Sequence, residues 1–240
     1  MTHLTTCLDA ETVAARAAVE IARELERARE LRGVAHLALS GGSTPARTYE
    51  LLAGELKDWD GVEVWFADER CVAPEDAESN YRLAAETLLG AAGIDPARVH
   101  RMEGELGPEE GARRYADALR QHVPLDASEL PVRDLVVLGI GPDGHVASLF
   151  PGAPTLDAPE RAICLPVHDS PKPPPERITL SLAVLRAARR CLLLATGAGK
   201  ADAIAAALAE PSRHVPASLL RRERLTVIVD DAASPPPGVG

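Results

Sequence analysis

Short apolar runs alternate with longer stretches of helical periodicity along the chain. Val34–Leu39, Val62–Ala67 and Leu225–Val229 have the length and residue types of buried strands. Between such runs, apolar residues recur every three or four positions, as in the amphipathic first helix expected from Val13 to Ala28. Because strands that alternate with helices form parallel sheets, we expect an α/β fold: a single-domain, doubly wound, mostly parallel, Rossmann-like sheet with helices on both faces.

The rest of the chain repeats this alternation. Pro45 suits the first turn of a helix, with Ser43 or Thr44 as its cap. Residues 1–233 are expected to form one domain, because no repeat or long low-complexity linker divides them, and residues 234–240 are expected to form a disordered tail. Further helices are expected at about Pro45–Glu55, Tyr81–Leu89, Pro108–His122 and Lys200–Ala209, and further strands at Val99–Met102, Leu135–Ile140, Arg161–Val167 and Cys191–Thr196.

Composition and charge argue against several classes of protein. The net charge is -10 and no basic cluster stands apart from it, so we expect no nucleic-acid partner. No apolar run approaches the ~20 residues that a membrane span needs, so no membrane association is expected. The four cysteines are scattered without a Cys-x-x-Cys pair, and no secretory signal is recognised at the start, which is typical of a reduced, cytoplasmic protein. A monomer is the expected state.

One histidine follows a sharp turn at the end of an apolar run. The run Leu135–Leu138 stops at glycines and a Pro-Asp-Gly turn, which brings His145 to the expected carboxyl end of a buried strand. Open α/β sheets bind ligands at that edge, and histidine is well suited to moving protons near neutral pH. A lone histidine is more often packed or capping, and its position after the turn is what favours catalysis. The other histidines lack metal-ligand spacing, so neither a metal nor another cofactor is expected.

The same segment contains a literal Gly-x-Gly-x-x-Gly, from Gly139 to Gly144. A dinucleotide site would need a helix that opens directly there and an acidic residue ~20 positions onward. The residues Pro142-Asp143-Gly144 are typical of a turn instead, and the segment lies past mid-chain. We therefore do not expect NAD to bind here.

The glycine-rich segment Ser40–Pro45 separates a predicted strand from a predicted helix. Its glycines allow the backbone to approach a ligand closely, and free N–H groups at a helix start bind anions. It is not a Walker A loop, because the Gly-Lys-Ser/Thr ending is absent. From the residues alone, an anion-binding loop and a tight turn that only caps a helix are equally supported.

Charged residues stand at three further strand ends or strand–helix junctions. Asp68–Arg70 follows the Val62–Ala67 strand, Arg177 follows the proline-rich segment Ser170–Pro175, and Lys200 opens a predicted helix. Plain surface charge is the usual role of such residues. Their shared placement allows them to converge on one anion, which arginine can hold with two parallel hydrogen bonds.

Taken together, five segments resemble the 6-phosphogluconolactonases, within the superfamily shared with glucosamine-6-phosphate deaminases. The resemblance implies a cofactor-free hydrolase of the pentose phosphate pathway that opens 6-phospho-D-glucono-1,5-lactone, a small sugar-phosphate substrate. It also implies that His145 is the general base and that the Ser-Gly-Gly loop, Arg177 and Lys200 hold the phosphate end. The segments are Ser40–Pro45, Trp65–Arg70, Glu78–Arg82, Gly139–Gly152, and Arg177 with Gly197–Lys200.

The candidate site therefore has a catalytic and a substrate-binding part. Asp143 is assigned beside His145, with two open roles: it orients the imidazole, or it only forms the turn. The catalytic candidates are His145 and Asp143, and the substrate-binding candidates are Ser40, Gly41, Gly42, Ser43, Thr44, Asp68, Arg70, Arg177 and Lys200.

Two other functions are weighed against the lactonase. The deaminases carry a catalytic glutamate five residues after the histidine, where this chain has Phe150, and typically Asp-Glu-Tyr where this chain has Asp68-Glu69-Arg70. Both departures favour the lactonase. A non-catalytic sugar-phosphate sensor on the same fold is the third hypothesis, because fold alone does not fix function. Such a sensor has no need of a histidine beside the bound sugar.

Overall fold

The structure is a computed structural model that describes residues 2–235. Its centre is a six-stranded sheet in which every neighbouring pair is parallel, as the alternating pattern predicts. The strand order is β1-β9-β8-β5-β2-β3: β2 and β3 extend the sheet to one edge, β5, β8 and β9 extend it in the other direction, and β1, the first strand of the chain, completes the far edge beside β9. The bounds are β1 (His3–Cys7), β2 (Ala35–Leu39), β3 (Val62–Phe66), β5 (Leu135–Gly139), β8 (Arg190–Ala195) and β9 (Leu225–Asp230).

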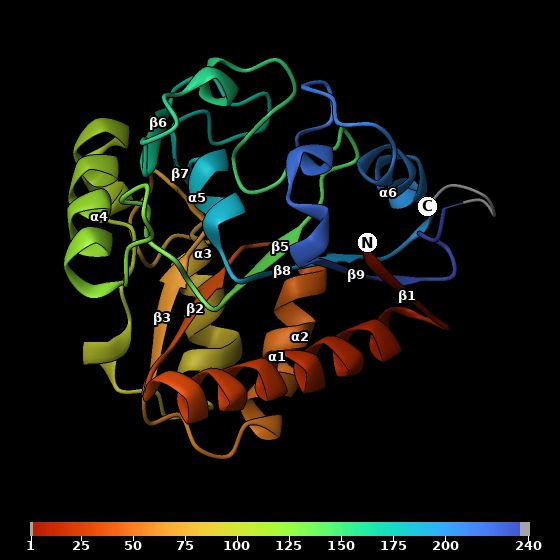
Figure 1. Ribbon diagram of the computed structural model, residues 1–240, viewed down its shortest axis with the longest axis horizontal. Coiled ribbons are helices and arrows are strands. Elements are labelled where there is room, and N and C mark those ends of the chain that lie inside the picture. The colour runs from red at the N-terminus through yellow and green to blue at the C-terminus, as the bar shows by residue number, and fades with distance from the viewer. Residues whose placement is uncertain (1, 236–240) are drawn as a thin grey trace.

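Helices cover both faces of this sheet. Figure 1 shows α1 and α2 beneath the sheet and α5 and α6 above it, so the predicted α/β fold class is confirmed. The helices are α1 (Ala10–Arg32), α2 (Ser43–Glu55), α3 (Asn80–Ala84), α4 (Pro108–His122), α5 (Leu182–Ala187) and α6 (Ala201–Leu208). A π-helical turn, η1 (Ala85–Leu89), continues α3, and short 3-10 turns are η2 (Pro96–Arg98), η3 (Gly104–Leu106), η4 (Pro154–Asp157), η5 (Ala198–Lys200), η6 (Pro216–Leu219) and η7 (Arg222–Arg224).

A small antiparallel sheet was not expected from the sequence. It has the order β4-β7-β6, formed by β4 (Asp68–Arg70), β7 (Arg177–Leu180) and β6 (Cys164–Val167). Asp68–Arg70 therefore leaves the main sheet at the end of β3 and pairs with a segment far along the chain. The strand predicted at Arg161–Val167 exists in shortened form, but it belongs to this second sheet.

Three details of the predicted elements are wrong or incomplete. The strand expected at Val99–Met102 is only an isolated bridge between Val99 and Val64, because the chain turns into η3 directly afterwards. Neither Ser43 nor Thr44 caps α2: both lie inside the helix, and Gly42 takes the cap position at a φ of 115°. The edge strand β1 was missed, since His-Leu-Thr-Thr-Cys lacks a continuous apolar run.

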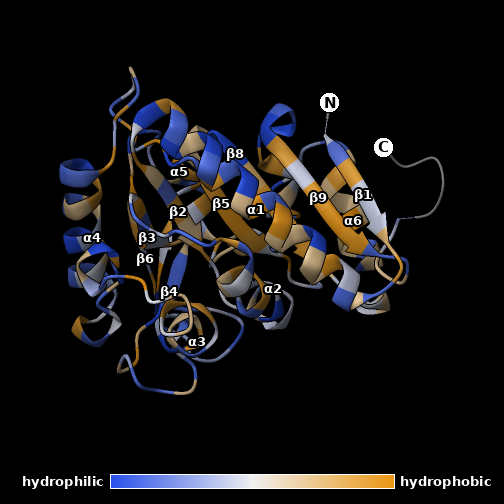
Figure 2. Ribbon diagram, turned by 90° about the horizontal axis from the view of Figure 1, so that it is seen from below, coloured by the Kyte–Doolittle hydropathy of each residue, from blue (hydrophilic) through white to orange (hydrophobic). Residues whose placement is uncertain are grey.

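The core fills the space between the sheet and its helices with aliphatic side chains. Every residue of β2 and β9 is buried, and α1 turns Val13, Ile21 and Leu25 inward. Figure 2 shows the same segregation, with the apolar central strands behind polar outer helix faces. Helices long and apolar enough to cross a membrane are absent from the described residues.

The C-terminal tail and the single domain are the remaining predictions about the organisation of the chain. Of the tail predicted at 234–240, residues 236–240 lie outside the described residues, whereas the Ser234 hydroxyl lies 3.2 Å from that of Thr6. That residues 1–233 form a single domain stays a prediction.

Candidate active site

The site lies where the order of strands reverses. From β2 the chain continues to β3 on one side, and from β5 it continues to β8 on the other, so the loops after β2 and β5 diverge and leave a crevice between them. Ligands of open α/β sheets bind at such switch points, outside the carboxyl ends of the strands. The Ser40–Gly42 loop and the His145 loop are those two loops.

A cavity of about 280 Å³ occupies this crevice. All the predicted site residues except Asp143 line it, and Asp143 stands behind His145. The fold thus brings together residues from Ser40 to Lys200. The lining residues are Ser40, Gly41, Gly42, Ser43, Thr44, Pro45, Asp68, Arg70, Asn80, Gly139, Ile140, Gly141, His145, Ala147, Lys172, Pro173, Arg177, Leu194, Ala195 and Lys200.

A larger hollow, of about 670 Å³, lies at the opposite, amino-terminal edge of the sheet. Its lining is rich in charged side chains that are already paired, such as Arg32 with Asp134 at 2.7 Å and Arg190 with Glu24 at 2.5 Å. It contains no histidine or glycine-rich loop. The smaller crevice at the switch point is therefore the better candidate site.

Asp143 and His145 form a hydrogen-bonded pair in the loop that follows the carboxyl end of β5. The Nδ1 atom of His145 lies 2.5 Å from Oδ1 of Asp143. Burial raises the pKa of Asp143, but the hydrogen bond and the charges of His145 and Lys172 outweigh it, so that this pKa is lowered overall. An ionised Asp143 accepts a hydrogen bond from Nδ1–H, which leaves the lone pair on Nε2. Burial lowers the pKa of His145, and this effect exceeds the opposing influence of Asp143. The imidazole is therefore neutral at pH 7.

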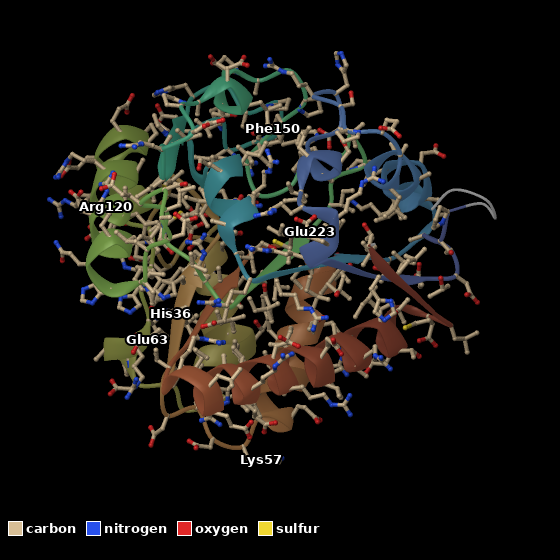
Figure 3. The ribbon with its side chains drawn as sticks, viewed as in Figure 1. His36, Lys57, Glu63, Arg120, Phe150 and Glu223 are labelled. Carbon is tan, nitrogen blue, oxygen red and sulfur yellow. The ribbon has the colours of Figure 1, made fainter. Side chains whose placement is uncertain are left out.

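The turn that carries His145 is shaped by glycine and by a packed aromatic ring. No helix opens after Gly139, and Gly144 adopts a φ of 81°, so the Gly-x-Gly-x-x-Gly match is a turn, as its Pro-Asp-Gly sequence predicts. Phe150 is buried and packs on the imidazole with ring centroids 4.7 Å apart. Figure 3 shows Phe150 among the loops above the sheet. An apolar ring thus covers the histidine at the position where the deaminases are expected to carry a carboxylate.

Asp68 lies in a buried hydrogen-bond network that joins the two loops. Its Oδ2 accepts a hydrogen bond of 2.7 Å from Ser148, and its Oδ1 accepts one of 3.2 Å from Asn80. Asn80 in turn packs so tightly against Gly41 that a Cβ there would lie 2.0 Å from its Oδ1. Asp68 therefore ties the His145 loop to the Ser40–Gly42 loop. Ser148 and Asn80 lie within the segments Gly139–Gly152 and Glu78–Arg82 of the resemblance, but neither was predicted as a site residue.

The two predicted phosphate ligands, Lys200 and Arg177, differ in how many of their hydrogen-bond donors are already used within the protein. Lys200 reaches over β5 and donates 2.7 Å to the carbonyl of Ile140. Most of the Arg177 guanidinium is used within the protein, because its Nε and Nη2 donate to backbone carbonyls of residues 172–174. Within the described part of the chain, its Nη1 has only a long contact of 3.5 Å, to Ser148. Arg70 lines the same wall, with Nη1 donating to the carbonyl of Glu78.

The first turn of α2 is free of a side-chain cap. Gly42 occupies the cap position and has no side chain to accept from the N–H groups of that turn. Thr44 does not substitute for it, because its hydroxyl lies 2.8 Å from that of Thr196. Uncapped N–H groups at a helix start bind anions well. Of the two hypotheses for Ser40–Pro45, this geometry favours the anion-binding loop.

Other histidines and cysteines are packed elsewhere. His36 accepts a hydrogen bond of 3.2 Å from Trp65 Nε1, and His100 stacks on Trp65 with ring centroids 3.9 Å apart. The four cysteines form no disulfide, and burial raises the pKa of Cys71 to about 12, as suits a packed thiol. Within residues 2–235, no group of three or more His, Cys, Asp or Glu side chains is placed to hold a metal ion.

Fold and crevice together define a doubly wound α/β protein with a histidine-bearing site at the switch point. The chain belongs to the family of glucosamine-6-phosphate isomerases and 6-phosphogluconolactonases, whose family model matches residues 8–229. It is 39% identical to the 6-phosphogluconolactonase of Streptomyces coelicolor over 94% of this chain and 91% of that protein. It is 40% identical to the human 6-phosphogluconolactonase, over 82% and 79% of the two chains. A 6-phosphogluconolactonase structure from Trypanosoma cruzi matches with a TM-score of 0.86 at 28% identity, over 97% and 96% of the two chains.

Proposed function

We propose that this chain hydrolyses 6-phospho-D-glucono-1,5-lactone to 6-phospho-D-gluconate in the oxidative pentose phosphate pathway. The observation that carries the proposal is the placement of His145, which lines the crevice while its Nδ1 lies 2.5 Å from Oδ1 of Asp143. A lactone already has an electrophilic carbonyl. The protein therefore needs only to activate water and to stabilise the oxyanion, without a covalent nucleophile.

In the proposed mechanism His145 acts first as base and then as acid. Water attacks the lactone carbonyl carbon while its proton passes to Nε2, which gives a tetrahedral oxyanion and an imidazolium. The carbon–oxygen bond to the ring oxygen then breaks, and the imidazolium returns the proton to that oxygen. Asp143 stabilises the imidazolium between the two steps. Proton transfer of this kind contributes roughly 10²–10⁴-fold to the rate.

The phosphate end of the substrate is assigned to the donors that line the crevice around His145. Support comes from the uncapped start of α2 beside Gly42, from the Lys200 ammonium and from Nη1 of Arg177. These donors hold a group that does not react. Binding energy from such a remote group orients the carbonyl for attack, so it raises kcat as well as affinity.

Phe150 favours hydrolysis over the alternative of deamination with isomerisation. That reaction moves a proton between C1 and C2 and needs a carboxylate base near C2, together with a supported acid at the ring oxygen. Asp68 is available for the first task but is already bonded to Ser148 and Asn80. For the second task the glutamate of the deaminases is missing, because Phe150 stands in its place and its buried ring lies against His145. Lactone hydrolysis requires neither group.

We also propose a cytoplasmic location, since the four cysteines form no disulfide. The pentose phosphate reaction uses no cofactor in this proposal. A sugar-phosphate sensor on the same fold would bind the lactone without turnover, so turnover separates it from the lactonase.

The proposal is tested by comparing lactone opening with and without protein at controlled pH, because the lactone also opens unaided. We expect acceleration by the wild-type chain and a loss of roughly 10²–10⁴-fold in kcat for His145→Gln, with the fold intact. The unphosphorylated lactone should lose kcat as well as affinity. The pKa of His145 is lowered from the ordinary histidine value of about 6.5. We therefore expect kcat/KM to fall only when the pH drops below about 6.5. Ammonia release from glucosamine 6-phosphate without lactone acceleration would favour the deaminase.

A further inference from the structure

The proline-rich loop Ser170–Pro175 is a closed structure that projects one lysine into the crevice. Its ends are joined by a hydrogen bond of 3.0 Å from the Ser170 N–H to the Pro175 carbonyl. Inside the loop, the Ser170 hydroxyl donates 2.7 Å to the carbonyl of Lys172 and accepts 3.2 Å from its N–H. The backbone of Lys172 is therefore fixed on both sides.

The side chain of Arg177 holds the backbone of the Ser170–Pro175 loop. Prolines have no N–H, so this loop has more carbonyl oxygens than its own backbone donors can satisfy. The buried guanidinium of Arg177 supplies the missing donors: Nη2 lies 3.0 Å from the carbonyls of both Lys172 and Pro173, and Nε lies 3.1 Å from that of Pro174. Most of this side chain thus serves the loop.

Lys172 stands next to the proposed catalytic pair. Its Nζ lies 3.7 Å from Oδ1 of Asp143, which is the same oxygen that pairs with Nδ1 of His145. Lysine is also a rare residue here: of 26 basic residues only three are lysines, namely Lys57, Lys172 and Lys200. Two of these three line the crevice, in a chain that uses arginine almost everywhere else.

We propose that Lys172, held in place by Arg177, is a positioning residue for the hydrolysis and acts through Asp143 as the third member of a Lys172–Asp143–His145 chain. This inference rests on the proposed function. The Lys172 ammonium keeps the Asp143 carboxylate ionised and turned toward Nδ1 of His145. Because two positive charges repel, it also disfavours protonation of the imidazole in the resting state. His145 thereby remains a base at lower pH.

The surrounding charges allow this assignment. His145 is influenced by Asp143 on its own turn, by Asp68 from β4 and by Lys172 from the loop. Asp68 favours the charged imidazole, whereas Lys172 lowers the pKa of His145. Lys200, at the start of α6, also faces Asp143; burial lowers the pKa of Lys200, and the charge of Lys172 lowers it further. Removal of the Lys172 charge should therefore raise the pKa of His145.

The test compares Lys172→Met with Lys172→Arg across about pH 5 to about pH 8. For Lys172→Met we expect the acid limb of kcat/KM to move upward by roughly half a pH unit to one unit, equally for the phosphorylated and the unphosphorylated lactone. Lys172→Arg should restore most of the wild-type profile. Lys57→Met is the matched control for the lost charge, because Lys57 lies on the opposite side of the molecule from Phe150 (Figure 3) and should leave the profile unchanged.

A second measurement is independent of turnover. In protein with ¹³C-labelled histidine, the imidazole signal that is absent from His145→Gln reports the pKa of His145 directly. It should rise in Lys172→Met by the same amount as the acid limb. Arg177→Lys keeps the charge but loses the carbonyl contacts, so it should raise the pKa of His145 by a similar amount. The double variant, Lys172→Met with Arg177→Lys, should raise this pKa little further.

Two results would overturn the inference. One is an imidazole pKa and an acid limb that do not move in Lys172→Met. The other is a KM increase confined to the phosphorylated lactone, which would make Lys172 a phosphate ligand only. If instead the imidazole pKa moves while the wild-type chain accelerates no lactone, the proposed function fails and the electrostatic coupling stands.

Discussion

Gly141 lies against the Asp143–His145 pair with no room for a side chain. A Cβ at this position would be 2.0 Å from Nδ1 of His145 and 2.3 Å from Oδ1 of Asp143. Gly141→Ala must therefore push the imidazole or the carboxylate aside. Because a displacement of about 1 Å can cost roughly 10²-fold in rate, we expect kcat to fall by about that factor or more.

The control for Gly141→Ala is Gly54→Ala. Gly54 lies in α2, and a Cβ added there would have no neighbouring atom within 4 Å, so this substitution should leave kcat unchanged. Steady-state kinetics on both variants, with circular dichroism to verify folding, make the comparison. Normal kcat in folded Gly141→Ala would mean that the close approach of Asp143 and His145 is not needed for turnover.

At the scale of elements, the buried carboxylate of Glu69 helps to hold the start of α3 to the small sheet. Glu69 on β4 accepts hydrogen bonds from the backbone N–H groups of Asn80 and Tyr81, at 2.7 Å and 2.8 Å, and from the Ser79 hydroxyl at 3.1 Å. Glu69→Ala leaves these donors without an acceptor. We expect a loss of about 2–4 kcal/mol in the free energy of unfolding, measured by denaturant titration.

A surface glutamate of the neighbouring turn is the comparison. Glu86 is exposed and, among residues 2–235, pairs only with Arg82, at 2.8 Å. Glu86→Ala should lower the free energy of unfolding by less than about 1 kcal/mol, the ordinary worth of an exposed pair. Equal losses in the two variants would show that Glu69 does not anchor α3.

The long periodic elements were predictable, and the short paired ones were not. Periodicity predicts the helix at 108–122 with the bounds that α4 has, because its apolar stripe is local information. The three-residue strand β4 gains its structure from pairing with β7, far along the chain, and three residues carry no period. Tertiary pairing is not readable from one segment.

The candidate site divides in the same way. His145, Lys200 and the Ser40–Gly42 loop follow apolar runs that end in turns. This pattern is visible in the sequence and predicts the ligand-binding edge of the sheet, and all three line the crevice. Ser148 and Lys172 become relevant only because the fold brings them to Asp68 and Asp143. The rarity of lysine in this chain was the available signal for Lys172.

At the scale of the whole molecule, we predict a monomer. The charge of -10 makes copies repel one another, and among the described residues the exposed large apolar side chains are few. Leu8, Leu31, Leu106 and Leu125 make up that set. Sedimentation equilibrium at moderate salt should give a mass near 25.4 kDa. Twice that mass at micromolar concentration would contradict the prediction.

The pairing of β1 with β9 has a consequence for how the protein is made. Every residue of β1 pairs with β9, and the order of the sheet gives it no other neighbour. A ribosome releases residues 3–7 long before residues 225–230, so β1 must wait unpaired while the rest of the sheet is synthesised. An apolar segment with an open edge would recruit other nascent chains during that wait. The side chains of His3, Thr5 and Thr6 are polar, which is also why β1 shows no apolar run in the sequence, and we expect them to limit such association while the strand is unpaired.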